Sequence, residues 1–363
     1  MHRIDTFLEL VVQQGGSDLH LISGQPPRIR LHGTLYEIKY RKLTAEETGG
    51  LILDIMPAHL RDEWESSSCY GVDFAYEIPG MSRFRINVLR HFKGIGAVIR
   101  TIPSRLMSME ELGLPPVLTS LCREKRGLIL VTGPTGSGKS TTLAAMLDFI
   151  NQDRRGHIIT VEDPVEFTHT NKNCLISHRE VGVQTPSFGS ALHSAVREDP
   201  DVILVGELRD YETISLAVTA AETGILIFGT LHANGSAVTV DRIINVFPGS
   251  LQPRIRSMLS SSLRGVISQQ LVRRADGKGR LAALEILVNT PAVANLIREG
   301  KTDMVYNVIQ SSGALGMQSL DSCLRRLVQE KMITGHEAYE KAVNKQDFVS
   351  LCEQGQGYEW PRN

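Results

Sequence analysis

Gly133-Pro-Thr-Gly-Ser-Gly-Lys-Ser140 fits the pattern G-x-x-x-x-G-K-[ST] and decides the fold around it. The apolar run Leu128–Val131 shortly before it predicts a short, buried strand. After it, Leu143, Leu147 and Ile150 recur at the spacing of one buried helix face. A strand, a glycine-rich turn and a helix in this order predict a phosphate-binding loop. Its glycines allow a tight turn, and the helix N-terminus attracts anions.

The loop supplies the residues that we expect to bind a nucleoside triphosphate. Lys139 is expected to contact the β- and γ-phosphates, and the Ser140 hydroxyl is expected to coordinate Mg²⁺. The full set of expected binding positions is Gly133, Pro134, Thr135, Gly136, Ser137, Gly138, Lys139, Ser140 and Thr141.

Length and composition limit the possible classes of protein. The chain has 363 residues, which is enough for two or three domains with separate cores. A net charge of −1 argues against a broad nucleic-acid-binding surface. No apolar run reaches the roughly 18 residues of a membrane span, and the start lacks a secretory signal. The 5 cysteines are scattered without a C-x-x-C pair, which is typical of reduced thiols in a cytoplasm.

Strand and helix patterns alternate in the middle of the chain. Ile158–Val161, Val202–Val205 and Ile225–Phe228 are further candidates for buried strands, and helical patterns cover Phe188–Val196 and Ile214–Ala221. Such alternation predicts an α/β domain with a mostly parallel sheet between helices. The expected segments are an α+β domain at 1–100, a linker at 101–117, the α/β domain at 118–290, and a helical region with a tail at 291–363.

The N-terminal segment contains a predicted β-hairpin in which Asp73–Ile78 and Arg83–Leu89 flank Pro79-Gly80. Apolar side chains alternate along its second strand, so Arg83 and Arg85 lie together on the opposite face. Arginines on an exposed sheet face are most often solvated charges. Next to a phosphate-binding domain they can instead face the nucleotide, and both interpretations stay open.

Polar residues follow the other predicted parallel strands, where such sheets bind ligands. Glu162 and Glu166 come at the end of the first strand, Glu207 after Val202–Val205, and His232 after the third. Hydrolysis needs Mg²⁺ beside the phosphates and a carboxylate that activates water. We assign Glu207 to Mg²⁺, Glu162 to the water and His232 to sensing the γ-phosphate, although the two glutamates can exchange roles. The alternatives are surface ion pairs for the acids and a structural role for the histidine.

Taken together, these segments resemble the secretion-type ATPases. The matching stretches are the Walker A segment Gly133–Ser140, the Asp box Ile159–Glu166, the Walker B segment Arg197–Arg209 and the His box Gly229–Asn234. Within that superfamily the chain is similar to the PilT-type type IV pilus retraction ATPases, from about residue 4 to residue 340. The stretches that carry this similarity are Ser17–Leu21, Asp241–Pro248 and Leu315–Leu320.

The resemblance implies a PAS-like N-terminal domain, a RecA-like P-loop ATPase domain and a helical C-terminal part, assembled as a ring-shaped homo-hexamer. It implies ATP and Mg²⁺ as ligands, and ATP hydrolysis that powers pilus retraction in twitching motility. It places the protein in the cytoplasm, peripheral at the inner membrane, acting on the platform protein of the pilus machine and not on nucleic acid. Arg83 and Arg85 would then neutralise phosphate charge.

Several positions depart from the family pattern and leave alternatives. Many members carry His where this chain has Ile225, and Gln and Arg near His91–Lys93. Ala233 and the stretch Asp276–Gly279 are also similar to PilU, the accessory retraction ATPase. The alternatives are a PilU-like ATPase, a nucleotide-binding regulator without turnover and, less favoured, a nucleic-acid translocase.

The cysteines separate retraction-type from extension-type members of the superfamily. Extension and secretion ATPases typically carry a four-cysteine zinc site, whose thiolates lie at short spacings. Cys69, Cys122, Cys174, Cys323 and Cys352 lie too far apart in this sequence for such a site. We therefore expect a zinc-free motor of the retraction type.

Overall fold

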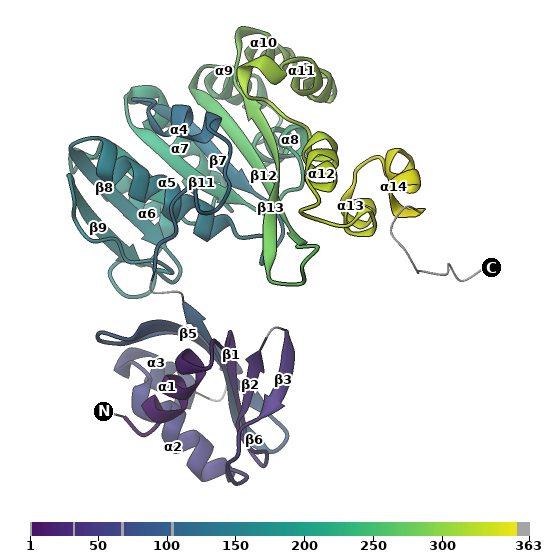
Figure 1. Cartoon of the computed structure of the whole chain (residues 1–363). Helices are drawn as coiled ribbons and strands as arrows, with labels where there is room; N and C mark the ends of the chain where they lie inside the picture. Colours follow the sequence, from purple (N-terminus) through teal and green to yellow (C-terminus); the bar gives the residue numbers. More distant parts are fainter. Residues whose placement is uncertain (1, 32, 67–68, 103–104, 354–363) are drawn as a thin grey trace. The chain divides into compact units, whose positions relative to one another are not determined.

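The computed structural model describes residues 2–31, 33–66, 69–102 and 105–353, and it divides into two compact units (Figure 1). Unit 1 comprises Met1–Arg105 together with Pro164–Phe167, and unit 2 comprises Leu106–Asp163 and Thr168–Asn363. The sequence predicts a weakly patterned tail after Asp347, but helix α14 (Val349–Glu353) lies within it, and residues 354–363 lie outside the described residues.

Unit 1 is built on a six-stranded antiparallel sheet in the order β3-β2-β1-β6-β5-β4. The strands are β1 (Asp18–Ile22), β2 (Arg28–Leu31), β3 (Thr34–Glu37), β4 (Gly71–Ile78), β5 (Ser82–His91) and β6 (Gly94–Ile102). The helices are α1 (Asp5–Gln13), α2 (Ala45–Ile55) and α3 (Ala58–Glu65). Apolar residues of α1 and α2 pack with one face of the sheet into a single core, which includes Leu8, Ile52 and Phe84.

The predicted hairpin is confirmed, since β4 pairs with β5 in an antiparallel register that sets Phe74 opposite Ile86. Burial alternates along β5: Phe84 and Ile86 are fully buried, whereas Arg83 and Arg85 are partly exposed. The period of two in the sequence therefore places both arginines on the face away from the core.

Unit 2 contains a seven-stranded sheet in the order β13-β12-β7-β11-β10-β8-β9, parallel throughout except for the β12–β13 pair. The strands are β7 (Gly127–Thr132), β8 (Gly156–Glu162), β9 (Cys174–Glu180), β10 (Val202–Val205), β11 (Leu226–Leu231), β12 (Leu263–Arg273) and β13 (Arg280–Val288). Because β7, β10 and β11 are buried on both faces, their sequences read as continuous apolar runs.

Helices cover both faces of this sheet. Leu128 and Leu130 of β7 belong to one core with α6–α11, whereas Ile129 and Val131 belong to a second core with α4 and α5. The helices are α4 (Val117–Cys122), α5 (Lys139–Asp153), α6 (Phe188–Ala195), α7 (Tyr211–Thr223), α8 (Ser236–Asn245), α9 (Gln252–Ser262), α10 (Pro291–Glu299), α11 (Val305–Ser311), α12 (Leu320–Gln329), α13 (Gly335–Lys341) and α14 (Val349–Glu353). The α/β fold class predicted from the sequence is confirmed.

The C-terminal segment is helical, as expected. Thr290 caps α10, with Pro291 in its first turn, and Gly300 ends the helix in the left-handed conformation (φ 72°). Helices α12 and α13 pack against β12 and β13 through a small core that includes Val272, Ala283 and Leu324. Strands β6, β9, β12 and β13 were not predicted from the sequence, so the antiparallel edge of the sheet is a new observation.

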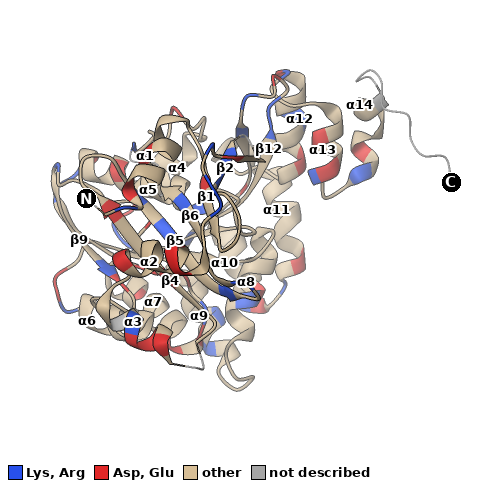
Figure 2. Cartoon of the chain, turned by 90° about the horizontal axis from the view of Figure 1, so that it is seen from below, with Lys and Arg blue, Asp and Glu red and all other residues tan. Residues whose placement is uncertain are grey.

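Charged residues of both signs are mixed along the elements of each unit (Figure 2). The five cysteines are free thiols, and four of them, at positions 69, 122, 174 and 323, are buried. Burial raises the pKa of the Cys122 thiol to about 12. In the described part of the chain, no three His, Cys, Asp or Glu side chains lie together as a metal site.

Candidate active site

The phosphate-binding loop runs from the end of β7 to the start of α5. Gly133 (φ 143°) and Gly138 (φ 86°) adopt backbone conformations that favour glycine. A Cβ atom at Gly133 would lie 2.2 Å from the carbonyl oxygen of Gln269, and one at Gly138 would lie 2.8 Å from the Nε2 of Gln269. Glycine is therefore needed at both positions for two reasons: a side chain would clash with β12, and the turn requires these backbone conformations.

The Lys139 side chain folds back over the loop. Its ammonium donates to the carbonyl oxygens of Gly133 at 2.9 Å and Pro134 at 3.2 Å. Lys139 is the first residue of α5, where the helix dipole adds positive potential. A cation, a helix N-terminus and a glycine-rich turn together are typical of a site for an anionic ligand.

The order of the strands brings the other candidate side chains to the same edge of the sheet. β11 lies between β7 and β10, with Leu231 opposite Thr132, and β8 follows β10, with Val205 opposite Val161. All four strands are parallel, so their carboxyl ends meet. The loop after β7, His232 after β11, Glu207 after β10 and Glu162 at the end of β8 therefore lie along one rim.

Glu207 is a largely buried carboxylate at this rim, with two neighbouring basic side chains. One of its oxygens lies 2.6 Å from the Arg209 guanidinium and the other 3.5 Å from His232 Nε2, and only 18% of its side chain is exposed. Burial alone raises the pKa of Glu207, but hydrogen bonding to Arg209 and the nearby positive charges, including Lys139, outweigh it and lower the pKa below its usual value. Glu207 is therefore ionised at neutral pH.

His232 lies next to Glu207, and the neutral form of its imidazole is favoured. Burial lowers the pKa of its imidazole, and the positive charge of Lys139 lowers it further. Its backbone carbonyl accepts a hydrogen bond from Arg242 of α8. A neutral imidazole can donate through one nitrogen and accept through the other, which suits a side chain that contacts a phosphate or water.

Glu162 is held close to Gly206. The Gly206 amide donates to the Val161 carbonyl at 2.7 Å, and a Cβ at Gly206 would lie 3.2 Å from the Glu162 Cα. The Thr230 hydroxyl donates to the Gly206 carbonyl from the neighbouring strand. These contacts hold the ends of β8, β10 and β11 together, and they fix the backbone positions of Glu162 and Glu207.

The three remaining candidates belong to unit 1. Arg85 lies 3.6 Å from Glu166 and 3.9 Å from Asp73, and Arg83 lies 3.7 Å from Glu77. Glu166 belongs to this unit because Pro164–Phe167 makes its contacts there. Both arginines are therefore paired with carboxylates, and they would have to exchange these partners to neutralise a phosphate.

Oxygen donors at the rim fit a magnesium ion. The Ser140 hydroxyl lies in the first turn of α5, and Glu207 provides an ionised carboxylate. Hydroxyl and carboxylate oxygens are the ligands that Mg²⁺ prefers, usually together with phosphate oxygens and water. When bound there, the ion would neutralise phosphate charge.

Sequence reasoning missed two side chains at this site. Arg209 pairs with Glu207, and Gln269 of β12 contacts the phosphate-binding loop. The signal for Gln269 was the polar run Ser268-Gln269-Gln270 inside a largely apolar stretch, where a buried polar side chain requires a partner.

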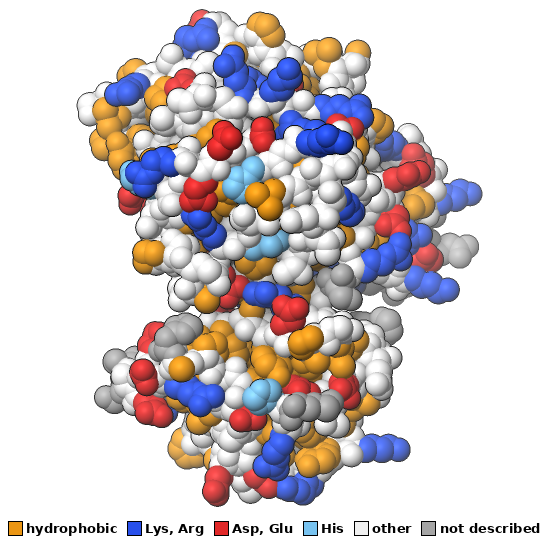
Figure 3. All heavy atoms as spheres, turned by 90° about the vertical axis from the view of Figure 1, so that its left-hand side faces the viewer, with side chains coloured by type: hydrophobic (Ala, Val, Ile, Leu, Met, Phe, Trp, Pro, Cys, Tyr) orange, Lys and Arg blue, Asp and Glu red, His pale blue; other side chains and the backbone are white. Residues whose placement is uncertain are grey.

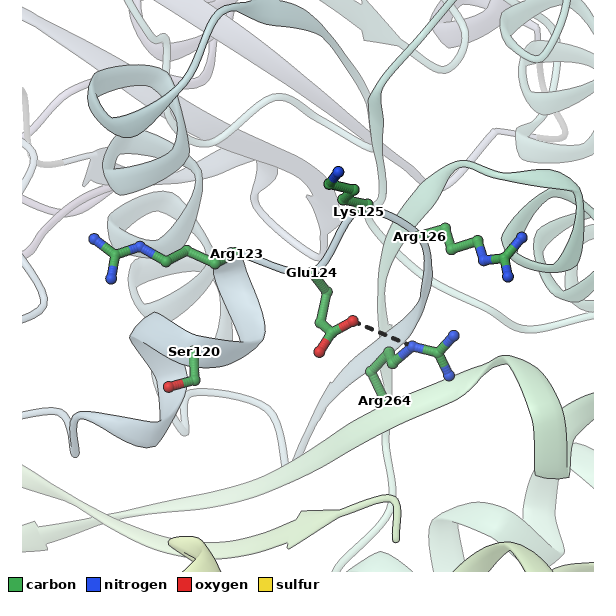
Figure 4. A pocket seen from close by; sticks show the side chains of 6 residues that line it. All are labelled: Ser120, Arg123, Glu124, Lys125, Arg126 and Arg264. Atoms are coloured by element: carbon green, nitrogen blue, oxygen red, sulfur yellow. Dashed lines mark ion pairs between the residues drawn. The ribbon is translucent and has the colours of Figure 1, made fainter. Parts of the chain in front are cut away.

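A separate cavity of about 460 Å³ lies at the opposite end of β7, next to its first residue (Figure 4). Its lining residues are Ser120, Arg123, Glu124, Lys125, Arg126 and Arg264. Glu124 pairs with Arg264 at 3.4 Å, and Arg123 pairs with Asp153 at 2.9 Å. This cavity is not the nucleotide site, because the phosphate-binding loop follows the carboxyl end of the same strand.

A phosphate-binding loop, carboxylates at adjacent strand ends and a RecA-like sheet define the chain as a P-loop ATPase. Its sequence matches the model of the family "Type II/IV secretion system protein" over residues 1–356, and the chain belongs to that family. The resemblance noted in the sequence is confirmed, and with it the assignment as an ATP-hydrolysing enzyme.

Individual relatives cover nearly the whole chain. The type IV pilus retraction ATPase PilT of Pseudomonas aeruginosa is 51% identical over 95% of this chain and 99% of its own length. The type IV pilus ATPase PilU of the same organism is 38% identical over 97% of this chain and 91% of its own. A crystal structure of the pilus retraction motor PilT with bound ADP superposes with a TM-score of 0.87, at 41% identity, over 96% of this chain and 98% of that one.

Among the described residues, no helix is both long enough and apolar enough to cross a membrane.

Proposed function

We propose that this chain is a Mg²⁺-dependent, hexameric ATPase that powers type IV pilus retraction and hence twitching motility. The observation that carries the proposal is the rim of unit 2, where the phosphate-binding loop, Glu162, Glu207 and His232 follow adjacent parallel strands. The similarity to PilT over almost the full length of both chains supports the pilus as its target.

The geometry supports a different role in hydrolysis for each of these residues. The loop amides and Lys139 bind the phosphates, and Ser140 with Glu207 would hold Mg²⁺. Glu162 orients and deprotonates the attacking water, and neutral His232 contacts the γ-phosphate. Glu166 is held by Arg85, and we assign it a smaller, supporting role. Arg83 and Arg85 neutralise phosphate charge after exchanging their carboxylate partners.

We place the protein in the cytoplasm, peripheral at the inner membrane, where it would act on the platform protein of the pilus machine. A nucleic-acid translocase is less well supported, since Lys and Arg are interspersed with Asp and Glu in each unit on the face shown in Figure 3. DNA-independent turnover in a phosphate-release assay would support the motor, whereas strong stimulation by DNA would support the translocase.

A regulator without turnover was suggested by Ile225, where many family members carry His. Ile225 precedes β11, and its carbonyl accepts from the Gly127 amide at the start of β7. His232 follows the other end of β11, roughly 20 Å away at about 3.3 Å per residue. Ile225, which stands in place of the family's His, is therefore remote from the rim within unit 2, and this favours an active enzyme. The higher identity to PilT than to PilU favours the principal retraction motor.

Deleting the gene should separate retraction from extension. Without a retraction motor, cells keep or gain surface pili but lose twitching, because filaments are built and not withdrawn. Pili would be counted by electron microscopy, and twitching zones would be measured on agar, with a plasmid copy of the gene as the control. Bald cells, or stoichiometric zinc in the purified protein, would contradict a retraction-type motor.

Activity should depend on assembly. If arginines act across a subunit boundary, specific ATPase activity rises with protein concentration until the ring forms.

We expect Arg85→Ala to lower kcat about tenfold or more while nucleotide binding changes little, because trans-acting arginines stabilise the transition state. Arg41→Ala is the matched control, since Arg41 is an exposed arginine of unit 1 that pairs with Glu47. A monomer in sedimentation, with activity independent of concentration, would refute the hexamer.

A further inference from the structure

Gln269 is a buried polar residue in the middle of β12, and only 2% of it is exposed. Its Nε2 donates to the Ser137 carbonyl at 2.7 Å, and its Oε1 accepts from the Thr142 hydroxyl at 2.7 Å. Ser137 lies in the phosphate-binding loop, and Thr142 lies in the first turn of α5. The Gln269 side chain therefore connects both the phosphate-binding loop and the first turn of α5 to the sheet.

Packing reinforces these two hydrogen bonds. The Gln269 backbone carbonyl fills the space where a side chain at Gly133 would be, and its Nε2 does the same at Gly138. Ser137 and Thr142 are 3% and 2% exposed, so solvent does not compete with the amide of Gln269 for these groups in the native protein. The loop thus has a fixed contact with β12 at each of its two ends.

The same strand pair also holds the segment that follows His232. The Ser268 hydroxyl accepts from the Gly235 amide at 2.8 Å, and the buried Glu285 of β13 accepts from the Ser236 amide at 2.6 Å. Adjacent side chains of β12 point to opposite faces of the sheet. Ser268 therefore contacts the segment after β11, while Gln269 contacts the loop after β7.

We propose that Gln269 is a positioning residue for nucleotide binding, which holds the phosphate-binding loop in shape through Ser137 and Thr142. The inference deepens the proposed ATPase function and rests on it. Gln269 makes its contacts on the side of the loop that faces the sheet, and it acts on the nucleotide only through the loop amides. Because these amides bind phosphate in the ground state and the transition state alike, their loss raises KM more than it lowers kcat.

The first test replaces Gln269 by Ala and by Glu. Ala removes both hydrogen bonds, whereas Glu keeps the acceptor for Thr142 and sets a carboxylate oxygen against the Ser137 carbonyl. We expect both variants to raise KM for ATP, and Kd for a fluorescent ADP analogue, about tenfold, which is about 1.4 kcal/mol, with kcat within about threefold of wild type. Gln270→Ala is the matched control, because the neighbouring glutamine faces the other side of the strand.

The second test is a double-mutant cycle with Thr142→Val, which removes the hydroxyl that donates to Gln269. The single variants leave an unpaired buried group, whereas the double variant removes both partners, so its effect on Kd should be smaller than the sum of the single effects. Thr142→Ser keeps the donor and should restore wild-type affinity. Additive effects of the two substitutions would contradict the proposed link.

The readouts separate positioning from general stability. A structural role alone would lower Tm and the fraction of active protein, which reduces apparent kcat and leaves KM unchanged. Unchanged Kd and KM in folded Gln269→Ala and Gln269→Glu proteins would overturn the proposal. Binding of the ADP analogue tests Gln269 without turnover, so a wild-type protein that binds nucleotide but does not hydrolyse ATP would refute only the proposed function.

Discussion

Replacing Lys139 by Ala or Gln abolishes ATP turnover and leaves the fold intact. Lys139 supplies a point charge at a site that is otherwise built from backbone amides, and its ammonium already lies against the loop carbonyls. No other lysine lies in the phosphate-binding loop. Without it, the charge on the β- and γ-phosphates is not neutralised during transfer, so we expect the steady-state rate to fall to background.

The measurement is phosphate release at saturating ATP, accompanied by circular dichroism to verify folding. Lys125→Ala is the matched control, because Lys125 lines the cavity at the opposite end of β7 and should be dispensable for hydrolysis. Turnover like that of wild type in the Lys139 variants would show that the nucleotide site has been wrongly assigned.

Replacing Glu207 or Glu162 by Gln slows hydrolysis by roughly 10²-fold or more and spares ATP binding. Glutamine preserves size and hydrogen bonding but removes the negative charge that metal binding or water activation requires. For Glu207 we expect a larger loss of hydrolysis rate, because the nearby positive charges of Arg209 and Lys139 also lose their counter-ion. Glu166→Gln should have a milder effect, since Arg85 is also held by Asp73.

Single-turnover hydrolysis and equilibrium binding of a fluorescent ATP analogue distinguish the two steps. Glu212→Gln provides the control, as an acid in the first turn of α7 with no assigned role in hydrolysis. If either catalytic variant turns over at the normal rate, that glutamate has no role in catalysis. A loss of binding equal to the loss of rate would instead indicate a ground-state contact.

The central part of the fold was predictable because its signals are local. Leu128–Val131 and Val202–Val205 are short apolar runs buried on both faces, and each is followed within two residues by a segment that carries candidate site residues. Both ends of the helix at Pro291–Glu299 could be predicted, because Thr290 is a typical N-cap residue and Gly300 a typical C-cap residue. In these places propensity, capping and tertiary packing agree.

The antiparallel edge of the sheet was missed because its signals are not local. β12 and β13 carry polar residues such as Gln269 and Glu285 at positions that would otherwise read as core. Their partners, Ser137 and the Ser236 amide, are 132 and 49 residues away in the sequence. A buried polar residue can be recognised from its setting, but the identity of its partner requires the fold.

The roles of the candidate residues stay predictions, although the fold explains why the nucleotide-domain candidates could be found. Glu162, Glu207 and His232 end strands that lie side by side, so a rule about parallel sheets was enough to group them. Arg83 and Arg85 followed from the two-residue period of β5, but their carboxylate partners did not. The face of a strand on which an arginine lies follows from the local sequence, whereas the partner that the arginine binds depends on the tertiary fold.

The distribution of thiols makes this protein convenient for chemical labelling. Cys69, Cys122, Cys174 and Cys323 lie inside the cores, and burial keeps the Cys122 thiol protonated, so maleimides should react with none of them in the native state. Cys352, in α14, is the more accessible exception. Changing it to Ser would give a background on which one engineered cysteine in each unit could carry a dye pair. Movements that accompany ATP turnover could then be followed by energy transfer without rebuilding either core.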